Sequence, residues 1–124
     1  MNSRGVLIAG LMLMLVGVMT GAFGAHAVKH MVSERYLDIW KTAANYQMIH
    51  ALGLIGLAIH IQQNALNRWL KVSGICFLSG VLVFSGSLYL MVILDLPRLG
   101  ILTPIGGLLF IAGWMSWLIS AIKN

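Results

Sequence analysis

Four uncharged stretches, each of about twenty residues or more, cover most of the chain and decide what it can fold into. They run over residues 5–25, 42–61, 72–94 and 99–122. Each can cross a hydrocarbon core of about 30 Å as a helix that rises about 1.5 Å per residue. The pattern therefore predicts an all-α integral membrane protein, folded as a four-helix transmembrane bundle with short loops.

The composition supports the same fold class. Hydrophobic residues make up 60% of the 124 residues and charged residues 9%, whereas a soluble domain carries about 25% charged residues. A chain of this size cannot hide so much apolar surface without lipid. We expect residues 1–124 to form a single transmembrane domain with spans at approximately 5–28, 41–62, 70–94 and 100–122.

The first span has two features of a signal peptide, because Arg4 precedes the apolar run and Ala25-His26-Ala27 resembles a cleavage site. Its apolar run is longer than that of a usual signal peptide, so we expect the chain to keep it. Glycines also gather on one face of this span and of the last one, where another helix can approach closely. The predicted helix-packing positions are Gly10, Gly17, Gly21, Gly24, Gly106 and Gly113.

Two of the connections between spans carry signals for the start of a helix. Ser33 followed by Glu34 is typical of such a start, and Tyr36 and Trp40 suit the headgroup layer. This pattern predicts an interfacial helical turn that runs into the second span. Before the fourth span, Thr103 and Pro104 are typical of an N-cap and a first helical position, later than hydropathy alone indicates.

Basic residues lie at the ends of the spans rather than in one patch, which argues against nucleic acid as a partner. One side of the membrane would hold Arg4, Arg68, Lys71 and Lys123, and the other Lys29, Arg35, Lys41 and Arg98. The α-amino group adds a positive charge to the first side. By the positive-inside rule, we expect both termini in the cytoplasm.

The second span carries most of the polar groups at membrane depth. Its inward stripe is formed by Tyr46, His50, Gly53 and Leu57, with Gln47 beside it. Its opposite face, which suits lipid, is formed by Met48, Leu52, Ile55 and Ile59. Because an ionisable group inside a bilayer needs a partner, two roles are open for His50. It either bonds a polar group of a neighbouring helix, or it serves as a proton relay, ligand or metal site.

Other spans add further candidates for a polar cluster at membrane depth. The full candidate set is His26, Tyr46, Gln47, His50, Ser85, Tyr89 and Thr103. A haem held by His26 and His50 would need both rings at similar depth, and their positions in the sequence argue against that. The four histidines have no recognisable metal-ligand spacing, so we expect no metal site and no cofactor.

Four ordered motifs carry a resemblance to a known family. They are Gly21-Ala22-Phe23-Gly24-Ala25-His26, Thr42-Ala43-Ala44-Asn45-Tyr46-Gln47-Met48-Ile49-His50-Ala51-Leu52, Phe84-Ser85-Gly86-Ser87-Leu88-Tyr89 and Thr103-Pro104-Ile105-Gly106-Gly107. Over essentially its whole length the chain resembles the YgdD/YwdK family of small bacterial membrane proteins, which has mitochondrial relatives. The resemblance implies four membrane helices and cytoplasmic termini. It implies no activity, because the family is known chiefly as a domain of unknown function.

Three function classes remain open. We expect a non-enzymatic packing or accessory protein of the cell membrane, whose glycine faces bind a second copy or a larger membrane complex. The alternative is a small-molecule, lipid or ion-handling protein with a cavity around His50 that opens toward residues 29–41. A further alternative binds haem or quinone. We do not expect an enzyme, because the sequence offers no nucleophile and base pair.

Overall fold

The computed structural model describes residues 1–123, and over that range the chain is helical and has no strand. The first rod is continuous and combines α1 (Ser3–Val18), the π-helical η1 (Met19–Gly24) and α2 (Ala25–Lys29). The other long helices are α3 (Glu34–Gln63), α4 (Arg68–Leu94) and α5 (Thr103–Lys123), with a 3-10 turn, η2 (Pro97–Ile101), before α5. The predicted all-α four-helix bundle is confirmed.

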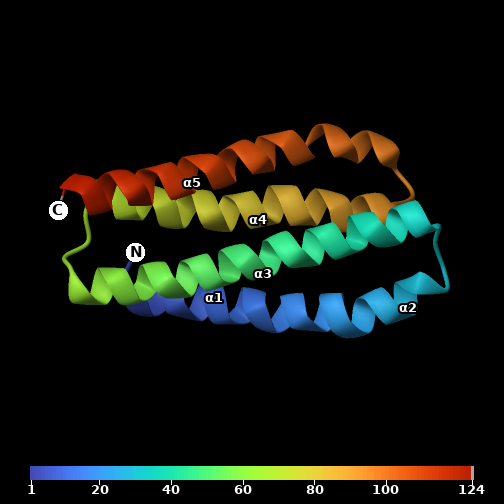
Figure 1. Cartoon of the computed structure of the whole chain (residues 1–124), viewed down its shortest axis with the longest axis horizontal. Coiled ribbons are helices and arrows are strands. Elements are labelled where there is room, and N and C mark those ends of the chain that lie inside the picture. Colours follow the sequence, from blue (N-terminus) through green and yellow to red (C-terminus); the bar gives the residue numbers. More distant parts are fainter. Residues whose placement is uncertain (124) are drawn as a thin grey trace.

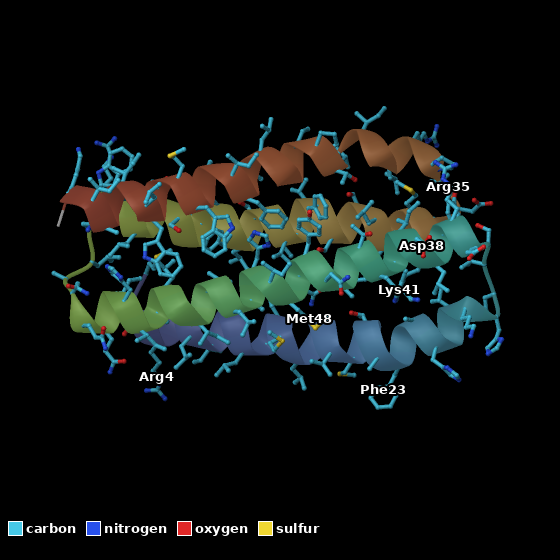
Figure 2. The ribbon with its side chains drawn as sticks, in the orientation of Figure 1. Arg4, Phe23, Arg35, Asp38, Lys41 and Met48 are labelled. Carbon is cyan, nitrogen blue, oxygen red and sulfur yellow. The ribbon has the colours of Figure 1, made fainter. Side chains whose placement is uncertain are left out.

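The four rods run alongside one another in alternating directions (Figure 1). α3 packs against α1 and α4, and α4 packs against α5. Both termini lie at one end of the bundle, together with the connection between α3 and α4. Arg4 lies toward this end, whereas Arg35, Asp38 and Lys41 lie toward the other (Figure 2). The bundle therefore has two charged ends with an uncharged length between them.

Three of the rods are long and apolar enough to cross a membrane by themselves: Ser3–Lys29, Arg68–Leu94 and Pro97–Lys123. α3 is not among them, because polar side chains interrupt its uncharged part. Two of these, Gln47 and His50, are each only 3% exposed and so face the neighbouring helices. α3 is the polar helix of the bundle, and it lies between two apolar ones.

The helix starts follow from side-chain caps. Ser33 Oγ accepts from the Tyr36 N–H at 3.2 Å, and α3 then runs for 30 residues without a break. The predicted interfacial turn is thus the beginning of α3 itself. Asn67 caps α4 in the same way through Leu70. These caps satisfy backbone donors that the first turn of a helix leaves free.

The predicted N-cap role of Thr103 is wrong. Thr103 is the first residue of α5, and the Leu102 carbonyl accepts the first bonds of this helix from the N–H groups of Ile105 and Gly106. Because η2 leads directly into α5, the backbone continues in a helical conformation through Leu102. The Thr103 hydroxyl is therefore available for another helix and lies 2.8 Å from Ser87 Oγ on α4.

Gly10 and Gly17 of α1 lie against α3, and Gly106 and Gly113 of α5 lie against α4. A Cβ at Gly17 would lie 2.7 Å from Met48 Cγ, and one at Gly10 would lie 2.9 Å from Ile55 Cγ1. The hydropathy stripe predicted that Met48 and Ile55 face lipid. They are instead half-buried against α1, because α3 has a helix on both sides. Leu52 is 59% exposed and does lie on the outer surface.

The remaining glycines of the predicted set also lie near neighbouring helices. A Cβ at Gly21 would lie 3.4 Å from Met48 Cε, and a Cβ at Gly24 would lie 3.1 Å from Trp40 Cζ2. At Gly113 it would lie 2.6 Å from Phe77 Cδ1. Within the predicted set the tightest approach is at Gly106, where a Cβ would lie 2.5 Å from the backbone nitrogen of Phe84.

Gly106 and Gly107 provide a matched test of this packing. Backbone cannot move aside as a flexible side chain can, so Gly106→Ala is expected to lower the free energy of unfolding by about 1–3 kcal/mol. A Cβ at Gly107 meets nothing within 4 Å, so Gly107→Ala is expected to be neutral or stabilising by up to about 1 kcal/mol through helix propensity. Thermal unfolding of both variants in detergent micelles measures the difference. Equal effects would contradict the close approach of α5 to α4.

Candidate functional site

His50 lies midway along α3 and makes two hydrogen bonds. Its Nδ1 is 2.8 Å from the Tyr46 carbonyl oxygen one turn earlier. A carbonyl only accepts, so Nδ1 carries the proton and Nε2 has a free lone pair. That lone pair accepts the indole N–H of Trp114 on α5 at 3.0 Å. The neutral imidazole thus has both nitrogens paired, and a proton on Nε2 would bring two donors face to face.

Aromatic rings from two other helices enclose this imidazole. It stacks on Phe110 of α5, with ring centroids 3.6 Å apart and planes 8° apart. Phe77 of α4 meets it edge-on at 5.4 Å, and the Trp114 ring lies 5.8 Å away. Stacking and edge contacts stabilise such rings beyond the burial of their area. His50 is therefore held as part of an aromatic core between α3, α4 and α5.

A second set of bonds connects the first rod, α3 and α4. Tyr89 Oη lies 2.7 Å from Gln47 Oε1 and 2.8 Å from Thr20 Oγ1. An amide oxygen only accepts, so Tyr89 donates to Gln47. The Thr20 hydroxyl also lies 3.1 Å from the Gly17 carbonyl, so its one proton is shared between that carbonyl and Tyr89 Oη. Gln47 Nε2 then donates to the Leu13 carbonyl at 2.8 Å. The result is a directed chain of hydrogen bonds across three helices, which we call the Tyr89 chain.

The π-helical segment η1 contributes a backbone carbonyl to the contacts between the first rod and α3. The Thr20 carbonyl, within η1, accepts the indole N–H of Trp40 at 2.8 Å, and Trp40 also meets the Tyr89 ring edge-on at 4.8 Å. Single π turns recur at functional sites because they change which backbone groups are available. Thr20 and Trp40 were missed as site residues, since no spacing in the sequence marks a π turn.

Serines on α4 bond both neighbouring helices. Ser85 is buried and donates to the Ala43 carbonyl of α3 at 2.7 Å. Ser87 lies beside Thr103 of α5, as described above. Ser85, Ser87 and Thr103 are thus separate from the Tyr89 chain, and the candidate cluster is divided into several small groups.

Two candidate residues occupy other positions than the sequence indicated. His26 is exposed on α2, where its ring meets that of His30 edge-on at 5.7 Å, so the structure does not bring it to the polar groups of α3. His26 comes soon after the glycines of the first rod in the sequence, but it does not share their buried face. Tyr46 is 42% exposed. Its ring lies against Phe84 at 4.7 Å, while its hydroxyl makes no recorded bond within residues 1–123.

The two histidines considered for a haem lie apart in the structure. His26 and His50 belong to different parts of the bundle, so one iron could not bind both. Within residues 1–123, no group of three or more His, Cys, Asp or Glu side chains could hold a metal ion.

One hollow lies at the end of the bundle opposite the termini. It is a groove of about 580 Å³ between α2, the start of α3 and the end of α4. Neither His50 nor the residues of the Tyr89 chain line it. This groove is therefore not the cavity around His50, open toward residues 29–41, that the sequence left as an alternative.

Asp95 stands at the edge of the groove in an unusual backbone conformation. Its φ of 53° is the one positive value among the described non-glycine residues, and it ends α4 where glycine is the usual choice. The Leu96 N–H turns back to the Met91 carbonyl at 3.1 Å. The left-handed conformation costs a non-glycine residue of order 1 kcal/mol. In return the Asp95 carboxylate accepts the Tyr36 hydroxyl at 2.8 Å.

Comparison with known proteins identifies the family. The sequence profile of a family described as "Protein of unknown function (DUF423)" matches residues 20–107, about seven tenths of the chain. The chain belongs to this DUF423 family. The matched range begins at Thr20 and ends at the fifth residue of α5, so it contains Tyr89, Gln47 and His50 but not Trp114.

Relatives of known sequence agree with this assignment. A UPF0382 membrane protein of Staphylococcus haemolyticus is 43% identical over 118 residues, which are 94% of each chain. The UPF0382 membrane protein YwdK of Bacillus subtilis is 35% identical over 117 residues, 94% of this chain and 95% of its own. No solved structure matches the chain. The resemblance to the YgdD/YwdK family is thereby confirmed, and this DUF423 protein is a membrane protein of a family without an assigned activity.

Two tyrosines test the Tyr89 chain. Tyr89→Phe removes the donor to Gln47, so the free energy of unfolding is expected to fall by about 1 kcal/mol, the usual size for such bonds in membranes. Tyr46→Phe deletes a hydroxyl without a recorded bond and is the matched control, with an expected change below about 0.5 kcal/mol. Denaturation in mixed micelles measures both. A loss at Tyr46 as large as at Tyr89 would contradict the chain.

Tyr36 provides a pH test at the groove. The hydrogen bond to the Asp95 carboxylate, together with partial desolvation and the negative charge of Asp95, raises the pKa of Tyr36. Protonated Tyr36 is therefore the form that stabilises the fold, and this stability is present below about pH 10, the ordinary pKa, and lost as pH rises through the raised value. In Asp95→Asn, phenolate absorbance should appear at lower pH than in the wild type, and Tyr36→Phe assigns the signal. Identical titrations would contradict the bond.

Proposed function

We propose that this DUF423 protein is a non-catalytic component of the cell membrane that acts through its outer surface, as self-associated copies or as a subunit of a larger membrane complex. The observation that carries the proposal is the pairing of His50. The imidazole of His50, deep in α3, already bonds the Tyr46 carbonyl and the Trp114 N–H through its two nitrogens. The Trp114 N–H occupies the lone pair with which a neutral imidazole would accept a proton or bind a ligand.

The surface that would meet a partner is different from the one that the glycines suggested. The glycine faces of α1 and α5 are occupied inside the bundle by α3 and α4. The outer rods instead present large apolar side chains, such as Leu15 on α1 (64% exposed) and Leu108 on α5 (66% exposed). Such faces suit lipid or another membrane helix. A second copy would therefore meet α1 or α5 from outside.

The mass of the native particle tests this proposal. A monomer has a mass of 13.5 kDa, so a particle gently extracted from its own membranes should be a multiple of that mass or contain other subunits. Chemical cross-linking in intact membranes before extraction guards against dissociation by detergent. A protein that remains monomeric under both conditions would contradict the proposal.

Two His50 variants separate a packing role from proton handling. The Gln carbonyl oxygen in His50→Gln can accept the Trp114 N–H but cannot titrate, whereas His50→Leu leaves that donor unpaired at a cost of about 1–3 kcal/mol. A packing role expects His50→Gln to keep near wild-type thermal stability and assembly, and His50→Leu to lose both. Proton handling expects both variants to lose proton flux in vesicles equally. Flux that is present in the wild type and absent from a stable His50→Gln would overturn the packing role.

We further propose that both termini face the cytoplasm. They lie at the same end of the bundle, and the basic residues Arg4, Arg68, Lys71 and Lys123 flank the spans on that side. Positive charge is retained on the cytoplasmic side during insertion. A reporter that is active only outside the cytoplasm should be silent at the C-terminus and active when inserted between α2 and α3. The reverse pattern would contradict this orientation.

A further inference from the structure

The groove at the end opposite the termini combines an apolar wall with a single charge. Five apolar side chains form the wall: Val28, Met31, Val32, Val92 and Ile93. Ser33, Tyr36 and Asp95 complete the lining. The Ser33 and Tyr36 hydroxyls are already bonded to the α3 backbone and to Asp95, respectively. The Asp95 carboxylate is therefore the charged group that a guest would meet.

Asp95 forms no ion pair within residues 1–123, although the positive charge of Arg35 acts on its partner Tyr36 and partly opposes the rise in the pKa of Tyr36. The recorded partner of Asp95 is the neutral Tyr36 hydroxyl, which bonds one of the two carboxylate oxygens. No Lys or Arg lines the groove, and no basic side chain of residues 1–123 pairs with Asp95. The carboxyl end of α4 lies beside it, and such helix ends also favour cations. Charge complementarity therefore selects a cationic guest.

The position of the groove favours a guest that comes from the membrane. Asp95 directly follows an uncharged stretch that ends at Leu94, which places it at the boundary between hydrocarbon and headgroups. Two side chains of the apolar wall are open to the surroundings, since Met31 is 80% and Ile93 64% exposed. An acyl chain could thus enter from the bilayer while the headgroup stays beside Asp95. A volume of about 580 Å³ lies in the usual range of about 300–1,000 Å³ for small-molecule sites.

We propose that this groove binds phosphatidylethanolamine. The upper part of an acyl chain lies against Val28, Val32 and Val92, and the primary ammonium group donates to the free oxygen of the Asp95 carboxylate. The Tyr36 hydroxyl holds the other oxygen and so fixes the direction of the carboxylate. The left-handed conformation of Asp95 is explained by this role, because a glycine would end α4 without strain but would offer no charge.

A substitution at Asp95 can remove the charge without removing the fold. Asn also tolerates the left-handed conformation, and its side-chain oxygen can still accept the Tyr36 hydroxyl. Asp38→Asn is the matched control, because Asp38 is exposed near the same end of the bundle but outside the groove. Both variants change the net charge by the same amount.

The experiment is native mass spectrometry of the intact protein with an equal mixture of phosphatidylethanolamine, phosphatidylcholine and phosphatidylglycerol that carry the same acyl chains. The wild type and Asp38→Asn should retain phosphatidylethanolamine over phosphatidylcholine about fivefold or more, because a primary ammonium group can donate charge-assisted bonds and a quaternary one cannot. Asp95→Asn should lose this preference. Ile93→Trp, which fills the apolar part, should reduce retention of all three lipids.

Several results would overturn the proposal. Equal retention of the three lipids by the wild type would show a groove without headgroup recognition. A preference for phosphatidylglycerol would show that basic residues dominate instead of Asp95. An unchanged preference in Asp95→Asn, with its fold verified by the same thermal unfolding as the control, would place the lipid elsewhere. None of these outcomes depends on the oligomeric state or on His50.

Discussion

The absence of water in the hydrocarbon core is the constraint on which the rest of the structure depends. A polar side chain at that depth costs free energy until another protein group bonds it. α3 brings Gln47 and His50 into this environment, and each is bonded by a neighbouring helix. Gln47 fixes α3 against α4 and the first rod, and His50 fixes it against α5. The bundle is thus assembled around its most polar helix.

Packing between small and large residues makes these bonds possible. Trp114 can reach His50 because Gly53 leaves room for it, since a Cβ there would lie 3.3 Å from Trp114 Cη2 and from Phe77 Cε2. On α4, a Cβ at Gly80 would lie 2.5 Å from Phe110 Cδ1, and Phe110 is the ring that stacks on His50. Steric fit and hydrogen bonding therefore depend on each other, because without the glycines the aromatic rings could not approach the imidazole.

The sequence predicted the bundle and the inward direction of Gln47 and His50, because long apolar runs and helical periodicity are properties of single helices. It did not predict the hydrogen-bond partners, because these depend on how two helices are placed relative to each other. Trp114 was assigned to no site, and Thr20 was not considered, since the π turn that positions it leaves no pattern in the sequence. Met48 and Ile55 were assigned to lipid because the periodicity of α3 shows one polar stripe and cannot show a second packed face. His26 ends the first of the four motifs that carry the family resemblance, yet it is exposed on α2.

The same constraint explains why the ends of the bundle differ from its interior. Inside the membrane an unpaired charge would be prohibitive, so the chain uses neutral groups that bond one another, and these groups have little capacity left for a guest. At the boundary the cost of a charge falls because water is near, and there the chain keeps Asp95 in a strained conformation with only a neutral hydroxyl as its partner. Backbone strain tends to persist at binding sites, and the strained Asp95 lies beside an apolar groove, so we relate its conformation to the proposed binding of a guest there. Chemistry in this protein is therefore to be sought at its membrane boundary, while the polar interior determines how the helices fit.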